Sequence, residues 1–318
     1  ENPSLTIAVL TYLRPEDIGE SIPALLDQVN RYAGQAQVLV VDNDAAGSAR
    51  EMVEKFAAAN LQYVIEPTPG IAAARNRAIS EVGTDLLVFI DDDERPTHDW
   101  LWHLVSTFMA YPGLFGVVGR VKSEFAKTPD PWLIAGRFFE RRDLPTGTEV
   151  DIVATNNLLL DQKRLNESGL RFDESFGLTG GSDTMLSHEA KRLGFGFRFC
   201  REALVFDAVP LERMTREWVL RRAYRMGNSW SRTNLAAESS RTARGLLRLK
   251  LTVGGLARLG AGAGFALFGK VFGSQKWHAN GWRIFTRGAG IFAGTWGHAY
   301  AEYDRPKTVN RRWWQRRE

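Results

Sequence analysis

The chain has 318 residues, of which 44% are hydrophobic and 25% are charged, a composition typical of a folded protein with one large domain or two smaller ones. A single cysteine, Cys200, excludes a disulfide framework within the chain. The apolar run at residues 5–10 is too short for a signal sequence or a membrane span.

Charge is distributed unevenly along the chain, which the net charge of +4 conceals. Residues 1–200 carry 19 basic and 29 acidic side chains, a balance of −10, whereas residues 201–318 carry 22 basic and 8 acidic ones, a balance of +14. The acidic front part argues against a nucleic-acid partner. The basic rear part indicates contact with an anionic membrane surface or a phosphate-bearing partner, and a solvated basic face is the alternative.

Apolar runs alternate with stretches of helical periodicity through the first half of the chain. Strands are predicted at residues 5–10, 38–41, 61–65 and 86–90, and helices at residues 16–32, 48–59 and 70–82. This alternation is typical of βαβ units and predicts an α/β fold with a largely parallel sheet. Ligands of such sheets bind beyond the carboxyl ends of the strands, so we expect Tyr12, Asp42 and Asp91 to line one rim.

The second half of the chain carries weaker signals. Strands are predicted at residues 116–121, 152–160 and 196–206, and helices at residues 184–193 and 218–231. The sequence therefore predicts two domains, an α/β domain at residues 1–210 and a basic helical region, rich in Trp and Gly, at residues 211–318.

The rear region has the composition of a membrane-associated segment. Residues 246–272 mix apolar residues with spaced cations, and their longest uncharged stretch, residues 259–269, is too short to cross a bilayer. Interfacial aromatics accompany it at Trp277, Trp282, Trp296, Trp313 and Trp314. This combination predicts a helix lying in the membrane interface. The alternative is a packed helical subdomain, which the glycines at positions 254, 255, 260, 262 and 264 would suit.

Three adjacent carboxylates, Asp91, Asp92 and Asp93, follow the fourth predicted strand. They repel one another unless positive charge compensates them, and Mg²⁺ or Mn²⁺ does so through oxygen ligands while bridging to substrate phosphates. The alternative is a polar turn that caps the helix expected near Thr97, although one aspartate would suffice for a cap. The sequence therefore predicts a Mg²⁺ or Mn²⁺ site at this run of three aspartates.

Three further polar positions carry weaker signals. A carboxylate at Asp42 would accept hydrogen bonds from a nucleobase or ribose, or would order a turn. Arg75 would approach a phosphate, or would be a surface cation. Asp183 follows two glycines at the start of a predicted helix, where it would act either as a general base or as an N-cap.

Taken together, these segments resemble the family 2 glycosyltransferases, which have the GT-A fold, and within that family the exopolysaccharide glucosyltransferases of the succinoglycan ExoM type. The resemblance covers residues 5 to about 230. It rests on Thr11-Tyr12-x-Arg14-Pro15, Val41-Asp42-Asn43-Asp44-Ala45, Ala74-Arg75-Asn76, Phe89-Ile90-Asp91-Asp92-Asp93-Glu94 with Trp100-Leu101, Gly180-Gly181-x-Asp183-Thr184, and Trp218-x-x-x-Arg222-x-x-Arg225-x-Gly227.

The resemblance implies a role for each matched residue. Residues that would bind the nucleotide are Thr11, Tyr12, Arg14, Asp42, Arg75, Asp91 and Asp92. Asp91 and Asp93 would form the Asp-x-Asp motif of the family, with Asp93 as the direct metal ligand, and Asp183 would be the catalytic base. Arg221, Arg222 and Arg225 would bind a lipid-linked pyrophosphate acceptor, or alternatively lipid head groups.

Two positions depart from the family pattern. Ser182 stands where the family usually has a glutamate before the catalytic aspartate, which puts the local electrostatics of Asp183 in question. Phe206 stands where related enzymes carry a further metal-binding histidine, and the neighbouring Asp207 is a candidate substitute.

The implied activity is an inverting, metal-dependent transfer of a hexose, with glucose as the first choice, from a UDP-sugar to a saccharide acceptor. The acceptor would be linked to polyprenyl diphosphate, and the enzyme would work at the cytoplasmic face of the cell membrane in polysaccharide synthesis. Two alternatives are a sugar-nucleotide- or membrane-binding protein with a decayed active site, and a nucleotidyltransferase. A nucleotidyltransferase would be expected to have a Gly-rich loop after its first strand, and Tyr12-Leu13-Arg14-Pro15 lacks glycine.

Overall fold

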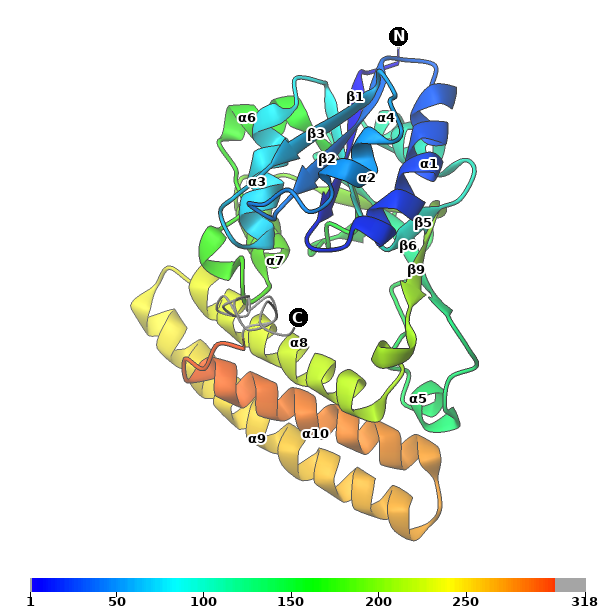
Figure 1. The fold of residues 1–318 in the computed structure, drawn as a ribbon. Helices are drawn as coiled ribbons and strands as arrows, with labels where there is room; N and C mark the ends of the chain where they lie inside the picture. Colours follow the sequence, from blue (N-terminus) through cyan, green and yellow to red (C-terminus); the bar gives the residue numbers. More distant parts are fainter. Residues whose placement is uncertain (1, 301–318) are drawn as a thin grey trace, which may run out of the picture.

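The computed structural model describes residues 2–300. Within these residues, nine strands form one sheet in the order β3-β2-β1-β4-β8-β6-β9-β5, with β7 also paired to β9. The sheet and its flanking helices form the upper part of the molecule in Figure 1, and three long helices form a separate layer below. The predicted α/β fold with a mainly parallel sheet is therefore confirmed.

The first half of the sheet is parallel, because β1 pairs in parallel with both β2 and β4, and β2 pairs in parallel with β3. Helices connect these strands in the alternation that the sequence predicts. The elements are β1 (Leu5–Thr11), α1 (Pro15–Arg31), β2 (Ala36–Asp42), α2 (Arg50–Glu54), β3 (Leu61–Ile65), α3 (Ile71–Glu81) and β4 (Leu86–Asp91).

The second half of the sheet is mixed, since β8 runs antiparallel to β4 and β6, and β9 runs parallel to β6. Its elements are β5 (Glu94–Pro96), α4 (Trp100–Ala110), β6 (Gly116–Phe125), α5 (Pro131–Ala135), β7 (Glu149–Val150), β8 (Asn157–Asp161), α6 (Gln162–Ser168), the 3₁₀ helix η1 (Glu174–Phe176), α7 (Ser182–Arg192), β9 (Phe197–Val209) and the 3₁₀ helix η2 (Leu211–Arg213).

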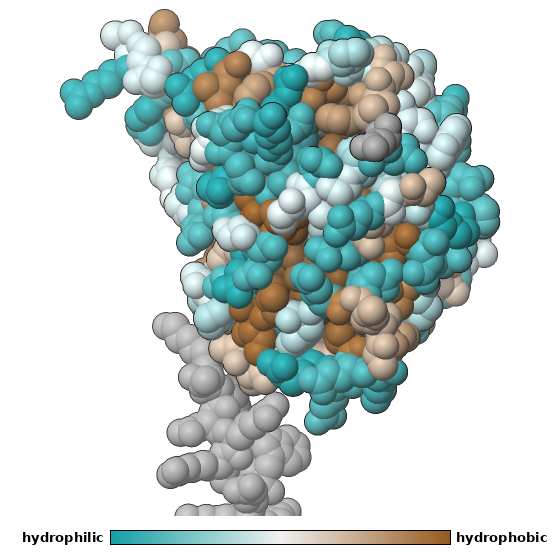
Figure 2. Space-filling model, turned by 90° about the horizontal axis from the view of Figure 1, so that it is seen from above, coloured by the Kyte–Doolittle hydropathy of each residue, from teal (hydrophilic) through white to brown (hydrophobic). Residues whose placement is uncertain are grey.

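Each face of the sheet is buried under its own set of helices. Along β1, Ile7 and Val9 belong to the core beneath α1 and α4, whereas Ala8 belongs to the core beneath α3, α6 and α7. This alternation follows from the two-residue period of a strand. Burial on both faces explains why the parallel strands read as continuous apolar runs. Seen from above, the face of the molecule opposite the helical layer shows hydrophilic residues interspersed with hydrophobic ones (Figure 2).

Two predicted elements are shorter than expected. The helix predicted at residues 48–59 is only α2, because Ala57 adopts a left-handed φ of 43°, which a right-handed helix does not accommodate. The strand predicted at residues 152–160 begins only at Asn157. The Asn157 side-chain amide donates hydrogen bonds to the carbonyl oxygens of Arg120 and Ala203, which tie the start of β8 to β6 and β9.

Three helices form the lower layer: α8 (Arg216–Ala237), α9 (Arg241–Val271) and α10 (Gln275–Thr295). Helix α10 lies between the other two and contacts both through glycines. A Cβ added at Gly262 or Gly281 would lie within 2.4 Å of backbone atoms across the α9–α10 contact, and one at Gly290 would lie 1.9 Å from the Tyr224 carbonyl oxygen of α8. The backbones approach this closely only because the side chains are absent.

The glycines expected to support close packing divide into two groups. Gly255 and Gly262 face α10, whereas an added Cβ at Gly260 or Gly264 would have no neighbour within 4 Å. Helix α9 therefore has a packed side and an open side. Trp313 and Trp314, expected as interfacial aromatics, lie outside the described residues.

Helix α9 has 31 residues and begins before the apolar segment at residues 246–272 that the sequence analysis described. Among the described residues it is the one helix whose length and composition would suffice to cross a membrane, with an 18-residue window of mean hydropathy 1.4. The expectation of a helix in the membrane interface, drawn from the short uncharged stretch at residues 259–269, therefore stays a prediction. It counted only the stretch without any charge, whereas a span tolerates an occasional cation that reaches back to the interface.

Gly290→Ala tests the close approach of α10 to α8. We expect it to lower the free energy of unfolding by about 2 kcal/mol or more, because the new methyl group collides with backbone that has no room to yield. Gly264→Ala is the matched control on the open side of α9, where alanine should raise stability by up to about 1 kcal/mol. Thermal unfolding followed by circular dichroism checks both. Equal effects of the two substitutions on stability would show that α10 and α8 are not in tight backbone contact.

Candidate active site

A cavity of about 660 Å³ lies beyond the carboxyl ends of β1 and β4 and is closed below by η2 and α8. Its volume is within the usual range for a small-molecule site. Loops after three parallel strands, the start of α7 and the front of α8 all contribute to its wall. The charged and polar lining includes Thr11, Tyr12, Arg14, Asn43, Arg75, Asp91, Asp92, Asp93, Glu94, Arg141, Asn156, Asp183, Asp207, Arg213, Arg222 and Arg225.

Carboxylates are crowded at the end of β4. Burial, and then repulsion from Asp93, raise the pKa of Asp91 to about 7. Burial likewise raises the pKa of Asp92 to about 6, although the nearby Arg14 cation opposes the rise. The pKa of the fully buried Glu94 is raised well above its usual value by burial and by Asp91. A compensating cation would relieve all three shifts.

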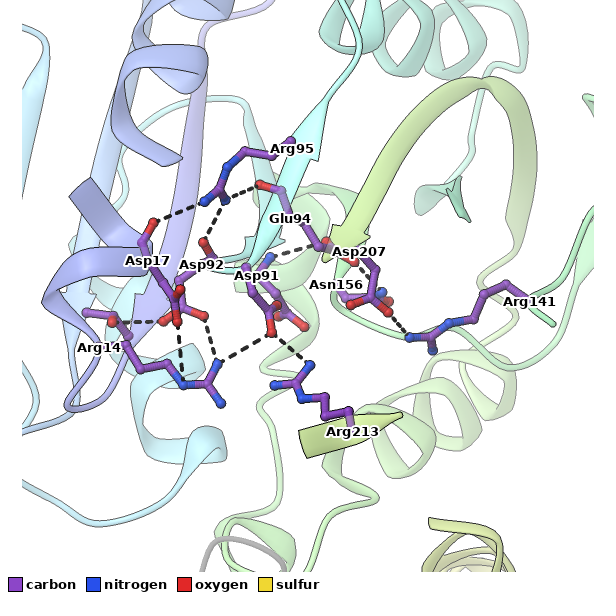
Figure 3. Close-up of polar contacts among 12 residues, drawn as sticks. Arg14, Asp17, Asp91, Asp92, Glu94, Arg95, Arg141, Asn156, Asp207 and Arg213 are labelled. Atoms are coloured by element: carbon purple, nitrogen blue, oxygen red, sulfur yellow. Dashed lines mark hydrogen bonds and ion pairs between the residues drawn. The ribbon is translucent and has the colours of Figure 1, made fainter. Parts of the chain in front are cut away.

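Arginines from distant segments approach these carboxylates (Figure 3). Arg14, just before α1, lies 3.3 Å from Asp92 and 3.5 Å from Asp93. Arg213, from η2, lies 3.0 Å from the same Asp93 carboxylate. Arg141 pairs with Asp207 on the opposite side of the cluster. Positive charge thus already converges on the position where the sequence predicts a metal.

The carboxylates fit a divalent cation that shares its ligands with substrate. Among residues 2–300, no group of three or more His, Cys, Asp or Glu side chains is arranged to hold a metal by itself. Mg²⁺ usually binds through one or two carboxylates, with waters and substrate phosphates completing the shell. Asp91 and Asp93, with Asp207 on the same cavity wall, supply that kind of donor set. The run Asp91, Asp92 and Asp93 does not cap α4, whose N-cap residue is Asp99.

Asp42 lies outside the cavity lining, although the sequence analysis expected it at the nucleoside. It is fully buried, and its carboxylate accepts hydrogen bonds from the Asp44 and Ala49 backbone N–H groups and from the Tyr63 hydroxyl, at 2.8 to 3.0 Å. These contacts order the loop after β2. Asn43 occupies the cavity wall in its place. A direct contact of Asp42 with a nucleoside stays a prediction.

Arg75 and Asp183 lie on the wall formed by α3 and α7. Arg75 is buried, with its guanidinium 5.3 Å from the centre of the Phe172 ring, and it donates a hydrogen bond of 2.9 Å to the Ser182 hydroxyl. Ser182 thus replaces the acidic residue of the family with a neutral partner for Arg75. Asp183 is not the N-cap of α7, which is Gly181. One Asp183 oxygen accepts a hydrogen bond from the Thr184 N–H, and its side chain lines the cavity.

Position 207, rather than 206, faces the cavity from β9. Successive residues of a strand point to opposite faces, so Phe206 points away and its ring lies 5.9 Å from the Lys122 ammonium. Asp207 is buried and lines the cavity together with Asp91 and Asp93. The structure therefore brings the candidate substitute for the missing histidine to the predicted metal position.

The three arginines of α8 do not share one face. Arg222 and Arg225 line the cavity, as expected for residues three apart on a helix. Arg221 is largely exposed, pairs with Glu217 and lies outside the cavity lining, so a role for it beside the other two stays a prediction. Burial, and then the Arg141 and Arg225 cations, lower the pKa of Arg222 to about 9. This wall of the cavity thus favours an anionic ligand.

Several lining residues carried no clear signal in the sequence. Glu94 continues the acidic run, but its Oε1 accepts a hydrogen bond of 2.7 Å from Asn156, which lies more than sixty positions later in the chain. Arg141 belongs to an irregular segment and Arg213 to the single-turn 3₁₀ helix η2, and neither segment has a periodic pattern in the sequence. Only the fold brings these residues to the carboxylate cluster.

Solved structures with the same overall fold include two proteins of low sequence identity. The mannosyltransferase PcManGT from Pyrobaculum calidifontis, in complex with GDP-Man and Mn²⁺, superposes with a TM-score of 0.59 at 18% identity and covers 93% of this chain and 88% of its own. TarS 1-349 from S. aureus, in complex with UDP-GlcNAc, superposes with a TM-score of 0.51 at 15% identity and covers 77% and 70%. The expected GT-A fold is thereby confirmed.

Sequence relatives include the succinoglycan biosynthesis protein ExoM of Rhizobium meliloti (strain 1021), which is 32% identical over 231 residues, 72% of this chain and 74% of that protein. The glycosyltransferase AglE of Haloferax volcanii is 26% identical over 212 residues, 64% of this chain and 66% of that protein. The model of glycosyl transferase family 2 matches residues 6–166. The chain belongs to glycosyl transferase family 2, and it is a glycosyltransferase.

Proposed function

We propose that this glycosyltransferase moves a hexose, with glucose as the first choice, from a UDP-sugar to a saccharide acceptor with inversion at the anomeric carbon. The acceptor is carried on polyprenyl diphosphate, and the product enters a cell-surface polysaccharide. The observation that carries this proposal is the convergence of Asp93, Asp183 and the expected nucleotide-binding residues Thr11 and Tyr12 on one cavity. Similarity to a succinoglycan biosynthesis protein supports polysaccharide synthesis.

Each part of the cavity has a chemical task in this reaction. Asp183 accepts the proton of the acceptor hydroxyl, while the Thr184 N–H holds one of its oxygens in place. The hydroxyl oxygen then attacks from the face opposite the leaving nucleotide, which inverts the anomeric configuration. Arg75 and Arg222 hold the diphosphate through charge-assisted hydrogen bonds.

A divalent cation, Mg²⁺ or Mn²⁺, would be held by Asp93 and Asp91 with Asp207 beside them. When bound, it neutralises the charge that develops on the diphosphate leaving group. Thr11 donates a hydrogen bond of 2.9 Å to Asp92, which orients that carboxylate for the nucleotide side of the site. The two similar solved structures hold GDP-Man with Mn²⁺ and UDP-GlcNAc respectively, so the binding test compares both nucleotides.

Membership of glycosyl transferase family 2 argues against the alternative that the chain is a nucleotidyltransferase. A decayed site is the remaining alternative, and it rests on Ser182 and Phe206. Both positions leave the proposed chemistry intact, because Ser182 still holds Arg75 and Asp207 faces the carboxylate cluster. Turnover measurements decide between the two.

Donor binding is tested by calorimetry with UDP, GDP and dTDP, each with Mn²⁺ and with EDTA. We expect one nucleotide, UDP, to bind at least 10-fold more tightly with Mn²⁺. Asp93→Ala should abolish this metal dependence, whereas Asp183→Asn should bind normally but lose at least 100-fold in turnover, because an amide accepts no proton. Unchanged turnover in Asp183→Asn would move the base elsewhere, and no nucleotide binding would support a decayed site.

The raised pKa of Asp91 predicts a dependence of stability on pH. The folded chain holds a proton at Asp91 up to a pH of about 7, which the unfolded chain has already released, so the free energy of unfolding falls as the pH rises toward 8. In EDTA at pH 8 we expect Asp91→Asn to be more stable by about 2 kcal/mol, or roughly 5 °C in Tm. At pH 4 the gain should vanish. The exposed Asp99→Asn is the control, and an equal gain there would contradict this explanation.

We infer membrane contact from the open side of α9. Leu246, Leu249, Val253, Leu256, Leu267 and Val271 recur at helical spacing and are more than half exposed. Lys250 and Lys270 add cations to the same helix. A stripe of apolar residues flanked by cations suits a helix buried in the headgroup region of a bilayer. We propose that residues 211–318 form the membrane-associated unit, attached to a catalytic unit at residues 1–210, on the cytoplasmic face.

An in-plane position suits α9 better than a crossing one, despite its length. Helix α10 packs along it and carries Lys276, Arg283 and Arg287, which a crossing α9 would draw toward hydrocarbon. Each such cation costs about 2.5–3.5 kcal/mol at the centre of a bilayer.

Vesicle flotation tests this surface. We expect the triple variant Leu249→Gln, Val253→Gln and Leu267→Gln to bind phosphatidylglycerol vesicles at least 10-fold more weakly, because three apolar side chains no longer enter the bilayer. The control replaces three exposed apolar residues of the catalytic unit, Trp102, Met109 and Leu193, with glutamine. Equal binding of both variants to the vesicles would show that the apolar residues of α9 do not contact the membrane.

A further inference from the structure

A second cavity, of about 440 Å³, lies beside the first. It is formed by the later part of β6, by α5 and by the chain that follows α5. Phe139 and Arg141 line both cavities, so the two spaces share a wall. The proposed donor and base residues lie in the first cavity alone.

The second cavity has an excess of positive charge. Five cations line it, Arg120, Lys122, Arg137, Arg141 and Arg142, against two carboxylates, Glu140 and Asp143. Ion pairs join Arg120 to Asp143 at 2.7 Å and Arg137 to Glu140. Within the described residues Lys122 and Arg142 form no ion pair. Arg142 donates a hydrogen bond to the Ile152 carbonyl oxygen, and the Lys122 ammonium lies over the Phe206 ring. The cavity is therefore suited to an anion.

The rest of the lining is apolar and aromatic. Phe125 and Phe139 meet edge to face with ring centres 5.1 Å apart, and Phe139 stacks on Trp218 of α8 at 6.0 Å. Leu133 and Ile134 of α5 add aliphatic surface. A free nucleotide or a hydrophilic sugar would leave this surface unused, whereas a ligand with an anionic head and an apolar chain would use both halves.

Helix α5 connects this cavity to the membrane-associated layer. Its Trp132 indole N–H donates to the His278 Nδ1 at 2.8 Å, and Asn280 and Arg283 of α10 donate to the carbonyl oxygens of Ala135 and Arg137. Ile134, on the same helix, lines the cavity and is 58% exposed. The helix thus contacts α10 of the helical layer, near which it lies in Figure 1, and also lines the second cavity.

We propose that the second cavity binds the phosphate and the first isoprenoid units of the lipid-linked acceptor. Lys122 and Arg142 contact the phosphate, and Phe125, Phe139 and Ile134 contact the apolar chain on its way to the bilayer. The saccharide end then passes Phe139 and Arg141 to reach Asp183 in the first cavity. This inference rests on the proposed function and adds to it the place where the acceptor enters.

Calorimetry with farnesyl diphosphate tests the inference on the full chain, with UDP and Mn²⁺ present at saturation to occupy the first cavity. We expect farnesyl diphosphate to bind, and inorganic diphosphate and farnesol each to bind at least 10-fold more weakly, because each lacks one half of the ligand. Lys122→Ala and Ile134→Asn should each weaken binding at least 10-fold. Lys163→Ala and Leu193→Asn, at exposed positions outside both cavities, should not.

The other outcomes are also decisive. Farnesyl diphosphate that binds only without UDP, or equally well to all four variants, would overturn the inference, and so would equally tight inorganic diphosphate, which would leave a simple anion site. UDP affinity and Tm should be unchanged in Lys122→Ala and Ile134→Asn, which excludes unfolding as the cause. If UDP itself fails to bind, the proposed function fails, and the variant comparison without nucleotide still decides the cavity.

Discussion

Repulsion among buried carboxylates at the end of β4 is the constraint on which the site depends. Burial and mutual proximity raise the pKa values of Asp91, Asp92 and Glu94, so each carboxylate left charged near neutral pH costs the fold stability. Arg14 and Arg213 offset part of this cost through ion pairs with Asp92 and Asp93. The fold is thus less stable because it contains a site that binds charged ligands strongly, as is common for active sites.

The compensating cations come from separate parts of the chain, before α1, from α3, from the segment after α5, from η2 and from α8. A nucleoside diphosphate with its divalent cation carries both signs of charge, and would therefore satisfy the carboxylates and the arginines together. The same reasoning explains the lowered pKa of Arg222, which is buried among other cations on the far wall. The cavity is matched to a ligand of mixed charge rather than to a simple anion or a lone metal.

The helical layer gives this charged cavity a fixed place above an apolar surface. Glycines bring α10 into backbone contact with α9 on one side and with α8 on the other, and α8 also forms the floor of the cavity. The exposed stripe of α9 and the proposed acceptor cavity are therefore joined through packed helices and the short helix α5. In the proposed function, this arrangement keeps a lipid-linked substrate within reach of a water-soluble donor.

The sequence by itself determined the parallel strands, the rim at Tyr12 and Asp91, the run of three aspartates after β4 and the basic rear part, because each depends on local periodicity, local spacing or composition. Only the tertiary structure decided that Asp207 and not Phe206 faces the cavity, that Arg221 points away, that Asp42 is buried in its own loop, and that Arg141, Arg213 and Asn156 join the carboxylates. It also decided which glycines of α9 are packed and which are open. These features depend on which face of an element meets a distant one, and contacts between remote segments leave no periodic signal in a single sequence.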